Sequence, residues 1–112
     1  MQVSEEKNGN VLVLDLSGRL DSATSPEFEK ILLGHVGSGD NRLVLDLAGL
    51  DYISSAGLRI LLMGAKRTRQ EAGAMVLCNL KAPIAEVLRM SGFLAILSVT
   101  PSRDEALEQA AA

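Results

Sequence analysis

The chain has 112 residues, 47% of them hydrophobic and 22% charged, so it can form one domain with one core and is too apolar to be disordered. Its net charge of −3 gives nucleic acid or an anionic membrane no electrostatic reason to bind. One cysteine excludes an internal disulfide, and neither a long apolar run nor a signal-peptide pattern is present, which predicts a cytoplasmic protein that does not insert into a membrane.

Two antiparallel strands are predicted at the start of the chain. The dipeptide Asn8-Gly9 favours a tight hairpin turn, and the flanking residues 2–7 and 10–16 read as strands. The segment Val11–Leu14 is the more apolar of the two, so we expect it to lie inside the sheet.

A helix is predicted after the connection Ser17–Asp21. Thr24 could cap this helix with Glu27 as its partner, or Ser25 could cap it with Pro26 at the first helical position. The apolar stripe of the helix would consist of Phe28, Ile31, Leu32 and Val36.

The centre of the sequence combines a buried strand with an amphipathic helix. Leu43–Leu47 is short and apolar enough for a strand covered on both faces. A helical pattern follows at Leu58, Leu61, Leu62 and Ala65. Between them, residues 51–57 are predicted to form a small polar loop that runs into the first helical turn. Free N–H groups at a helix N-terminus suit an anion, and the hydroxyls of Ser54 and Ser55 lie there.

A second buried strand is predicted at Ala74–Cys78. Gly73, just before it, is expected to cap the end of the central helix. Cys78 lies within the apolar strand, so we expect core packing from it rather than reactivity.

The last third of the chain repeats the alternation of helix and strand. Pro83 opens a predicted helix that Gly92 closes, and residues 93–99 include a last strand. That helix is expected to turn Ile84, Val87 and Leu88 inward. Ser102 and Glu105 have the spacing of a capping box for a terminal helix, which is expected to fray into the alanines of residues 110–112.

Strands that alternate with helices after an initial hairpin predict an α/β fold. We expect a single domain over residues 1–112, built on a mixed, largely parallel sheet.

Four segments of the chain resemble the STAS domain family: Ser17–Asp21, Leu43–Leu47, Asp51–Arg59 and Met90–Phe93. More narrowly, they look like those of stand-alone bacterial anti-sigma-factor antagonists. The resemblance implies a domain that binds an anti-sigma factor, typically a GHKL-type serine kinase. That kinase phosphorylates one serine at the start of the central helix and so weakens the complex, and a PP2C-type phosphatase restores it. The resemblance implies neither a cofactor nor catalytic residues.

The phosphorylated position of this family lies two residues before the glycine that precedes a leucine. That glycine corresponds to Gly57, so the position falls on Ser55. Many members have Asp before it and this chain has Ser54, which makes Ser54 the alternative acceptor. The partner-binding surface implied by the resemblance consists of Asp21, Thr24, Ser54, Ala56, Gly57 and Arg59. From the residues alone, either serine is simply an N-cap, and Asp21 and Thr24 are turn and cap formers.

Enzyme functions find little support in the sequence. No Gly-x-Ser-x-Gly elbow, Walker-type loop or Cys/His metal set is present. Two other functions stay open beside the leading one. The first is a STAS accessory subunit of a membrane transport, lipid-trafficking or stressosome-like complex that does not switch. The second is weak nucleotide binding at the helix N-terminus.

Overall fold

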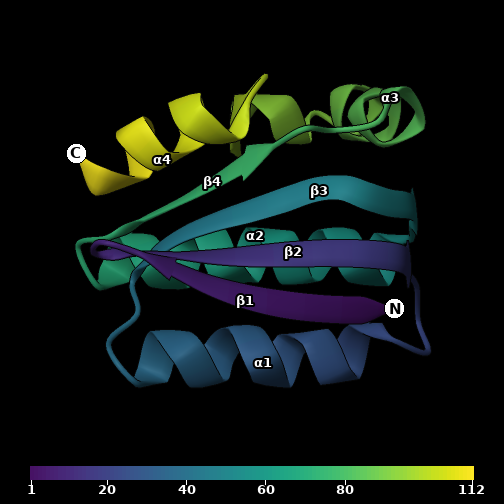
Figure 1. The fold of residues 1–112 in the computed structure, drawn as a ribbon. Coiled ribbons are helices and arrows are strands. Elements are labelled where there is room, and N and C mark those ends of the chain that lie inside the picture. Colours follow the sequence, from purple (N-terminus) through teal and green to yellow (C-terminus); the bar gives the residue numbers. More distant parts are fainter.

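The computed structural model describes residues 1–112 as five strands packed with helices on both faces of one sheet (Figure 1). The strands are β1 (Gln2–Asn8), β2 (Val11–Leu20), β3 (Arg42–Ile53), β4 (Ala74–Cys78) and β5 (Ser98–Thr100). The helices are α1 (Ser25–Gly37), α2 (Ser55–Gln70), α3 (Ala82–Met90) and α4 (Arg103–Ala111), with a short 3-10 turn η1 (Phe93–Ala95) between α3 and β5.

The sheet has the strand order β1-β2-β3-β4-β5. β1 is antiparallel to β2, and every other neighbouring pair is parallel. Asn8 pairs with Val11 across the hairpin, and Gly9 in the turn has a φ of 62° that suits glycine. The α/β fold, the initial hairpin and the largely parallel sheet are therefore confirmed.

Leucine and valine alternate along β2 and β3, and the two residue types face opposite sides of the sheet. The leucines pack against α1 and α2 in a core of 21 buried residues that includes Phe28 and Leu61. The valines, together with Cys78, pack against Ala106 and Ala110 of α4. Both faces of the central strands are thus covered, as expected for parallel strands.

The predicted polar loop at residues 51–57 is wrong, because β3 continues to Ile53. Tyr52 pairs with Arg19 and Ile53 with Leu20, and the buried side chains of Leu20 and Ile53 hold the extended ends of both strands in the core. Only Ser54 separates the strand from α2. The start of the helix is therefore fixed by two paired strands.

The end of α2 also differs from the prediction. Ala72, with a φ of 58°, is the left-handed residue after the helix, and the N–H of Gly73 donates to the carbonyl oxygen of Thr68. Gly73 is required for another reason: a Cβ there would lie 1.9 Å from the backbone oxygen of Asn41. The glycine permits a close backbone approach and is not the left-handed cap.

The last two helices correct two further details. Ile84 and Leu88 of α3 point inward as predicted, whereas Val87 is 37% exposed. In α4, the Ser102 hydroxyl accepts from the N–H of Glu105, so the predicted N-cap is confirmed, but the Glu105 side chain does not return a bond to the Ser102 N–H. The predicted fraying at Ala110 is wrong, because this residue is fully buried. Its carbonyl oxygen also accepts a hydrogen bond from Arg42 (2.8 Å).

None of the helices combines the length and the apolar composition that crossing a lipid bilayer requires.

Candidate functional site

Ser54 lies between the end of β3 and the first turn of α2. Its N–H donates to the carbonyl oxygen of Leu20 (2.9 Å), which ties the residue to the end of β2. Its hydroxyl accepts from the N–H of Gly57 (3.3 Å), so Ser54 is the N-cap of α2. The residue is half-buried, and its oxygen is already engaged by the helix.

Ser55 is the first residue of α2 and is exposed to solvent. Its hydroxyl makes no hydrogen bond within the chain, in contrast to the hydroxyl of Ser54. Arg59 is also exposed and lies four residues later, so both side chains occupy the same face of the helix. The structure thus presents one free hydroxyl at the positive end of the α2 dipole.

Gly57 is buried and does not belong to the exposed surface. A Cβ at this position would lie 2.8 Å from Leu20 Cγ, 2.9 Å from Ile53 Cγ1 and 3.0 Å from the Leu20 oxygen. Glycine therefore lets the first turn of α2 pack directly on the ends of β2 and β3. Gly57 thus has a packing role, and the adjacent Ala56 is half-buried; the contact of both residues with a partner stays a prediction.

Asp21 and Thr24 form a reciprocal pair in the connection before α1. The Asp21 carboxylate accepts from the Thr24 N–H (3.1 Å), and the Thr24 hydroxyl accepts from the Asp21 N–H (3.0 Å). Thr24 is the N-cap position of α1, as one of the two predicted alternatives has it, but its side chain makes no capping hydrogen bond. The alternative cap at Ser25 is wrong, because the Ser25 hydroxyl donates to the Asp21 carbonyl oxygen. The hydrogen bond from the Thr24 N–H, more than any other contact, holds the pKa of Asp21 below its ordinary value and keeps the carboxylate charged.

Sequence reasoning missed Arg19 and Tyr52, which are paired across β2 and β3. The Arg19 guanidinium lies 4.1 Å from the centre of the Tyr52 ring, a cation–π contact, and Arg19 Nε lies 3.8 Å from a carboxylate oxygen of Asp21. Tyr52 is 41% exposed. These two side chains meet because β2 and β3 both extend to this point. The sequence alone predicts a loop there and therefore does not pair them.

The exposed or half-exposed residues around the start of α2 are named here the serine surface: Arg19, Asp21, Thr24, Tyr52, Ser54, Ser55, Ala56 and Arg59.

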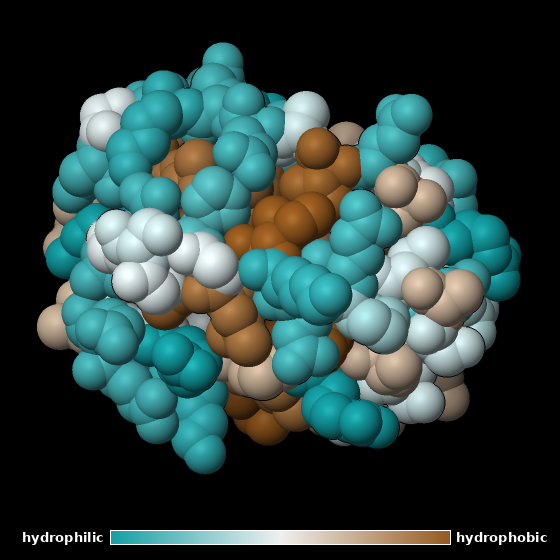
Figure 2. Space-filling view, turned by 90° about the horizontal axis from the view of Figure 1, so that it is seen from below, coloured by the Kyte–Doolittle hydropathy of each residue, from teal (hydrophilic) through white to brown (hydrophobic).

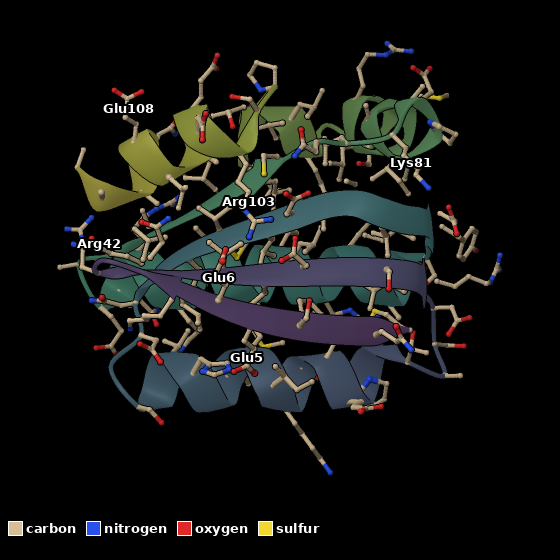
Figure 3. The ribbon with its side chains drawn as sticks, viewed as in Figure 1. Glu5, Glu6, Arg42, Lys81, Arg103 and Glu108 are labelled. Atoms are coloured by element: carbon tan, nitrogen blue, oxygen red, sulfur yellow. The ribbon has the colours of Figure 1, made fainter.

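A second polar cluster, also missed from the sequence, lies on the face of the sheet that carries α4 (Figure 3). Arg103 donates to Asp15 (2.8 Å), Asp46 (3.2 Å) and Glu6 (2.7 Å), one carboxylate from each of three neighbouring strands. Asn79 also donates to Asp46 (3.1 Å). These bonds join the first turn of α4 to the sheet, so we assign the cluster a structural role.

Two concave regions are present, and no residue of the serine surface lines either of them. One cavity of about 580 Å³ lies between the β1 edge and α1, with Met1, Val3, Leu16 and Ile31 among its lining residues. Figure 2 shows this side of the molecule, where apolar surface is visible in the middle of a mostly hydrophilic face. A second cleft, of about 720 Å³, lies beside α3 and β5. Neither includes any residue from Ser54 to Arg59, so the free hydroxyl lies on open surface that suits a protein partner better than a nucleotide.

No group of three or more His, Cys, Asp or Glu side chains is arranged to hold a metal ion.

The largely parallel sheet and the helix that begins directly after β3 define a class of small α/β domain. The STAS domain family matches residues 2–106, and the chain belongs to this family. Within it, the chain belongs with the anti-sigma-factor antagonists.

The first of three comparisons supports that assignment, and the other two support the fold. The chain is 45% identical to BtrV of Bordetella bronchiseptica, a protein assigned as an anti-sigma factor antagonist, over 95% of this chain and 91% of BtrV. A Thermotoga maritima protein of the same assignment has a similar fold, with a TM-score of 0.93 over 98% of this chain and 95% of that one, at 19% identity. The phosphorylated form of SpoIIAA from Bacillus gives a TM-score of 0.74 over 96% of this chain and 98% of that one, at 18% identity. The names of these proteins describe regulators and not enzymes, which agrees with the prediction that the chain is not an enzyme.

Proposed function

We propose that this protein is an anti-sigma-factor antagonist whose binding is switched by phosphorylation of Ser55. Unphosphorylated, it binds an anti-sigma factor that is also a GHKL-type serine kinase, and so frees a sigma factor to direct transcription. Phosphorylation by that kinase releases the complex, and a PP2C-type phosphatase restores the binding form. The 45% identity to BtrV supports the antagonist role, and the phosphorylated form of SpoIIAA supports a switch of this kind.

Ser55 is proposed as the phosphorylated residue because the hydroxyls of Ser54 and Ser55 differ in hydrogen bonding and exposure. Ser54 Oγ caps α2 and is half-buried, whereas Ser55 Oγ is exposed and has no partner within the chain. A kinase needs an accessible hydroxyl that can approach its bound nucleotide. Modification of Ser54 would also remove the cap from the N–H of Gly57. Ser55 is therefore the better acceptor.

Electrostatics explains why the switch would act on the partner and leave the fold intact. A phosphoryl group adds about −1.5 to −2 charges and three strong acceptors. At the N-terminus of α2 this charge is favoured by the helix dipole and by the free N–H groups of the first turn. On the partner's side, it meets a surface that had fitted closely to a small neutral side chain. Repulsion and added bulk then weaken the complex.

The test uses a candidate GHKL-type kinase from the source genome. Parent, Ser54→Ala and Ser55→Ala proteins are incubated with the kinase and ATP, and phosphopeptides are mapped by mass spectrometry. The proposal predicts modification of the parent and the Ser54→Ala variant at Ser55, and none of the Ser55→Ala variant. Partner binding without any modification would favour a STAS accessory subunit that does not switch. Affinity for nucleotide in the absence of both would favour a nucleotide-binding role.

A further inference from the structure

Four large hydrophobic side chains are exposed within one ten-residue segment. They are Val87 (37% exposed), Met90 (75%), Leu94 (40%) and Ile96 (51%), named here the 87–96 patch. The only other large hydrophobic side chain with comparable exposure is Tyr52, which belongs to the serine surface. The exposed apolar groups of this protein are therefore concentrated and not scattered.

The segment that carries the patch is anchored in the core. Ile84, Leu88 and Leu97 from the same stretch are buried in the main core. Gly92, with a φ of 82°, turns the chain from α3 into η1 and has open space around its Cβ position. The core residues of the segment thus hold it in place, and the four patch residues point away from the core.

An apolar cleft adjoins the patch. Its volume is about 720 Å³, and its lining includes Leu80, Ala85, Leu94 and Val99. Leu94 belongs to both features, so the cleft and the patch meet at this side chain.

The surface of the cleft and the patch also extends toward the serine surface. Lys81, which lines the cleft, forms an ion pair with Asp51 (2.5 Å), the residue next to Tyr52 in β3. Figure 1 shows α3 at the same end of the sheet as the start of α2 and the β2–α1 connection, and Figure 3 shows Lys81 at that end. A single protein that covers Ser55 can therefore extend across Lys81 onto the patch.

We infer that the 87–96 patch and its cleft form the apolar half of the site that binds the anti-sigma factor, and that they receive an apolar segment of it. The inference rests on the proposed function. A stable interface of standard size takes about 800 Å² from each partner and has an apolar centre with a polar rim. The serine surface supplies polar and charged groups but only one large apolar side chain, Tyr52. The patch supplies the missing apolar area.

The patch and Ser55 would affect binding of the anti-sigma factor independently. The patch provides affinity that does not depend on phosphorylation, because it lies outside α2 and none of its four side chains carries a hydroxyl. The phosphoryl group on Ser55 then acts at one side of the interface. Loss of the patch should weaken the unphosphorylated complex while Ser55 stays intact and exposed.

The experiment compares single substitutions by titration against the purified candidate kinase with ADP bound. Met90→Glu and Ile96→Glu should each raise Kd about tenfold or more, as for anchors of an interface. Met90→Leu keeps an apolar side chain and should bind within about twofold of the parent. Gln109→Glu adds the same charge at an exposed position of α4 and should bind like the parent. Thermal melting of each variant by circular dichroism checks that the fold is retained.

Parent-like affinity of both Met90→Glu and Ile96→Glu would overturn the inference while leaving the Ser55 switch in place. A parent dimer that these variants dissociate, with unchanged affinity for the kinase, would assign the patch to a second copy of this chain and also overturn it. Failure of the parent protein itself to bind would overturn the proposed function, and with it the assignment of the patch to that partner.

Discussion

Removal of the Arg103 guanidinium should be the most damaging single change among the charged residues. The Asp46 side chain is only 6% exposed, and Arg103 is the only cation within reach of it. In an Arg103→Met variant, Asp46 would keep its neutral donors, the Ala48 N–H and the Asn79 amide, and would face Asp15, its partner across β2 and β3. Leaving a buried charge without its partner costs about 3–5 kcal/mol. Because Arg103 is about a third exposed, we expect about 2–4 kcal/mol.

Chemical denaturation measures this loss directly, and thermal melting should show a drop in Tm of roughly 10–25 °C for a domain of this size. Glu6→Gln is the matched control, since Glu6 is 62% exposed and its ion pair with Arg103 should contribute less than about 1 kcal/mol. Asp46→Asn in the Arg103→Met background should restore part of the lost stability, because it removes the unpaired charge. A free energy of unfolding within about 0.5 kcal/mol of the parent for Arg103→Met would refute the assigned structural role.

Three further predictions concern stability. Ser54→Ala should destabilise the fold by about 1 kcal/mol through loss of the N-cap, and Ser55→Ala by less than about 0.5 kcal/mol; equal effects in urea denaturation would contradict the assigned roles. Burial raises the pKa of the Cys78 thiol to about 12 from 9.0. The unfolded chain therefore loses this proton first, and stability should fall by about 1.4 kcal/mol per pH unit above pH 9, a slope that Cys78→Ala should reduce. The hydrogen bond from Lys7 holds the pKa of Asp40 below 3.8, so the charged Asp40 stabilises the fold above that pH, and this stabilisation is lost as the pH falls. In acid denaturation, the Asp40→Asn variant should lose less stability with falling pH than the parent.

The order of strands and helices was predictable because it follows from local patterns. The apolar runs Val11–Leu14 and Leu43–Leu47 mark the central strands. The spacing of Leu58, Leu61 and Ala65 marks α2, and all three of these side chains are buried. The cap at Ser102 also depends only on residues three positions apart. Such signals lie within one turn of helix or a few residues of strand, where sequence spacing and spatial distance agree.

The missed features depend on residues far apart in the chain. Arg103 meets Glu6 and Asp15 across separations of 97 and 88 residues, which no spacing rule reveals. The polar residues Asp51 and Tyr52 suggested a loop, but pairing with β2 carries the strand past them. Tertiary context therefore overrode local preference at the point where the strand meets the functional helix.

The candidate serines themselves could be located from the sequence, because a hydroxyl before an apolar helix marks its N-terminus. Which of the two hydroxyls caps the helix required the structure. Both residues are serines, which are common at N-caps. The hydrogen bond from the Gly57 N–H shows that the Ser54 hydroxyl is the one that caps the helix. Gly57 likewise needed the structure, because its contact with Leu20 joins elements more than thirty residues apart.

The central claim is tested most directly by measuring Kd for the anti-sigma factor with the unphosphorylated protein and with protein phosphorylated at Ser55. We expect phosphorylation to raise Kd at least tenfold, while the circular dichroism spectrum of the protein stays the same. Equal affinity of the two forms would contradict the account, and so would a loss of helical signal on modification.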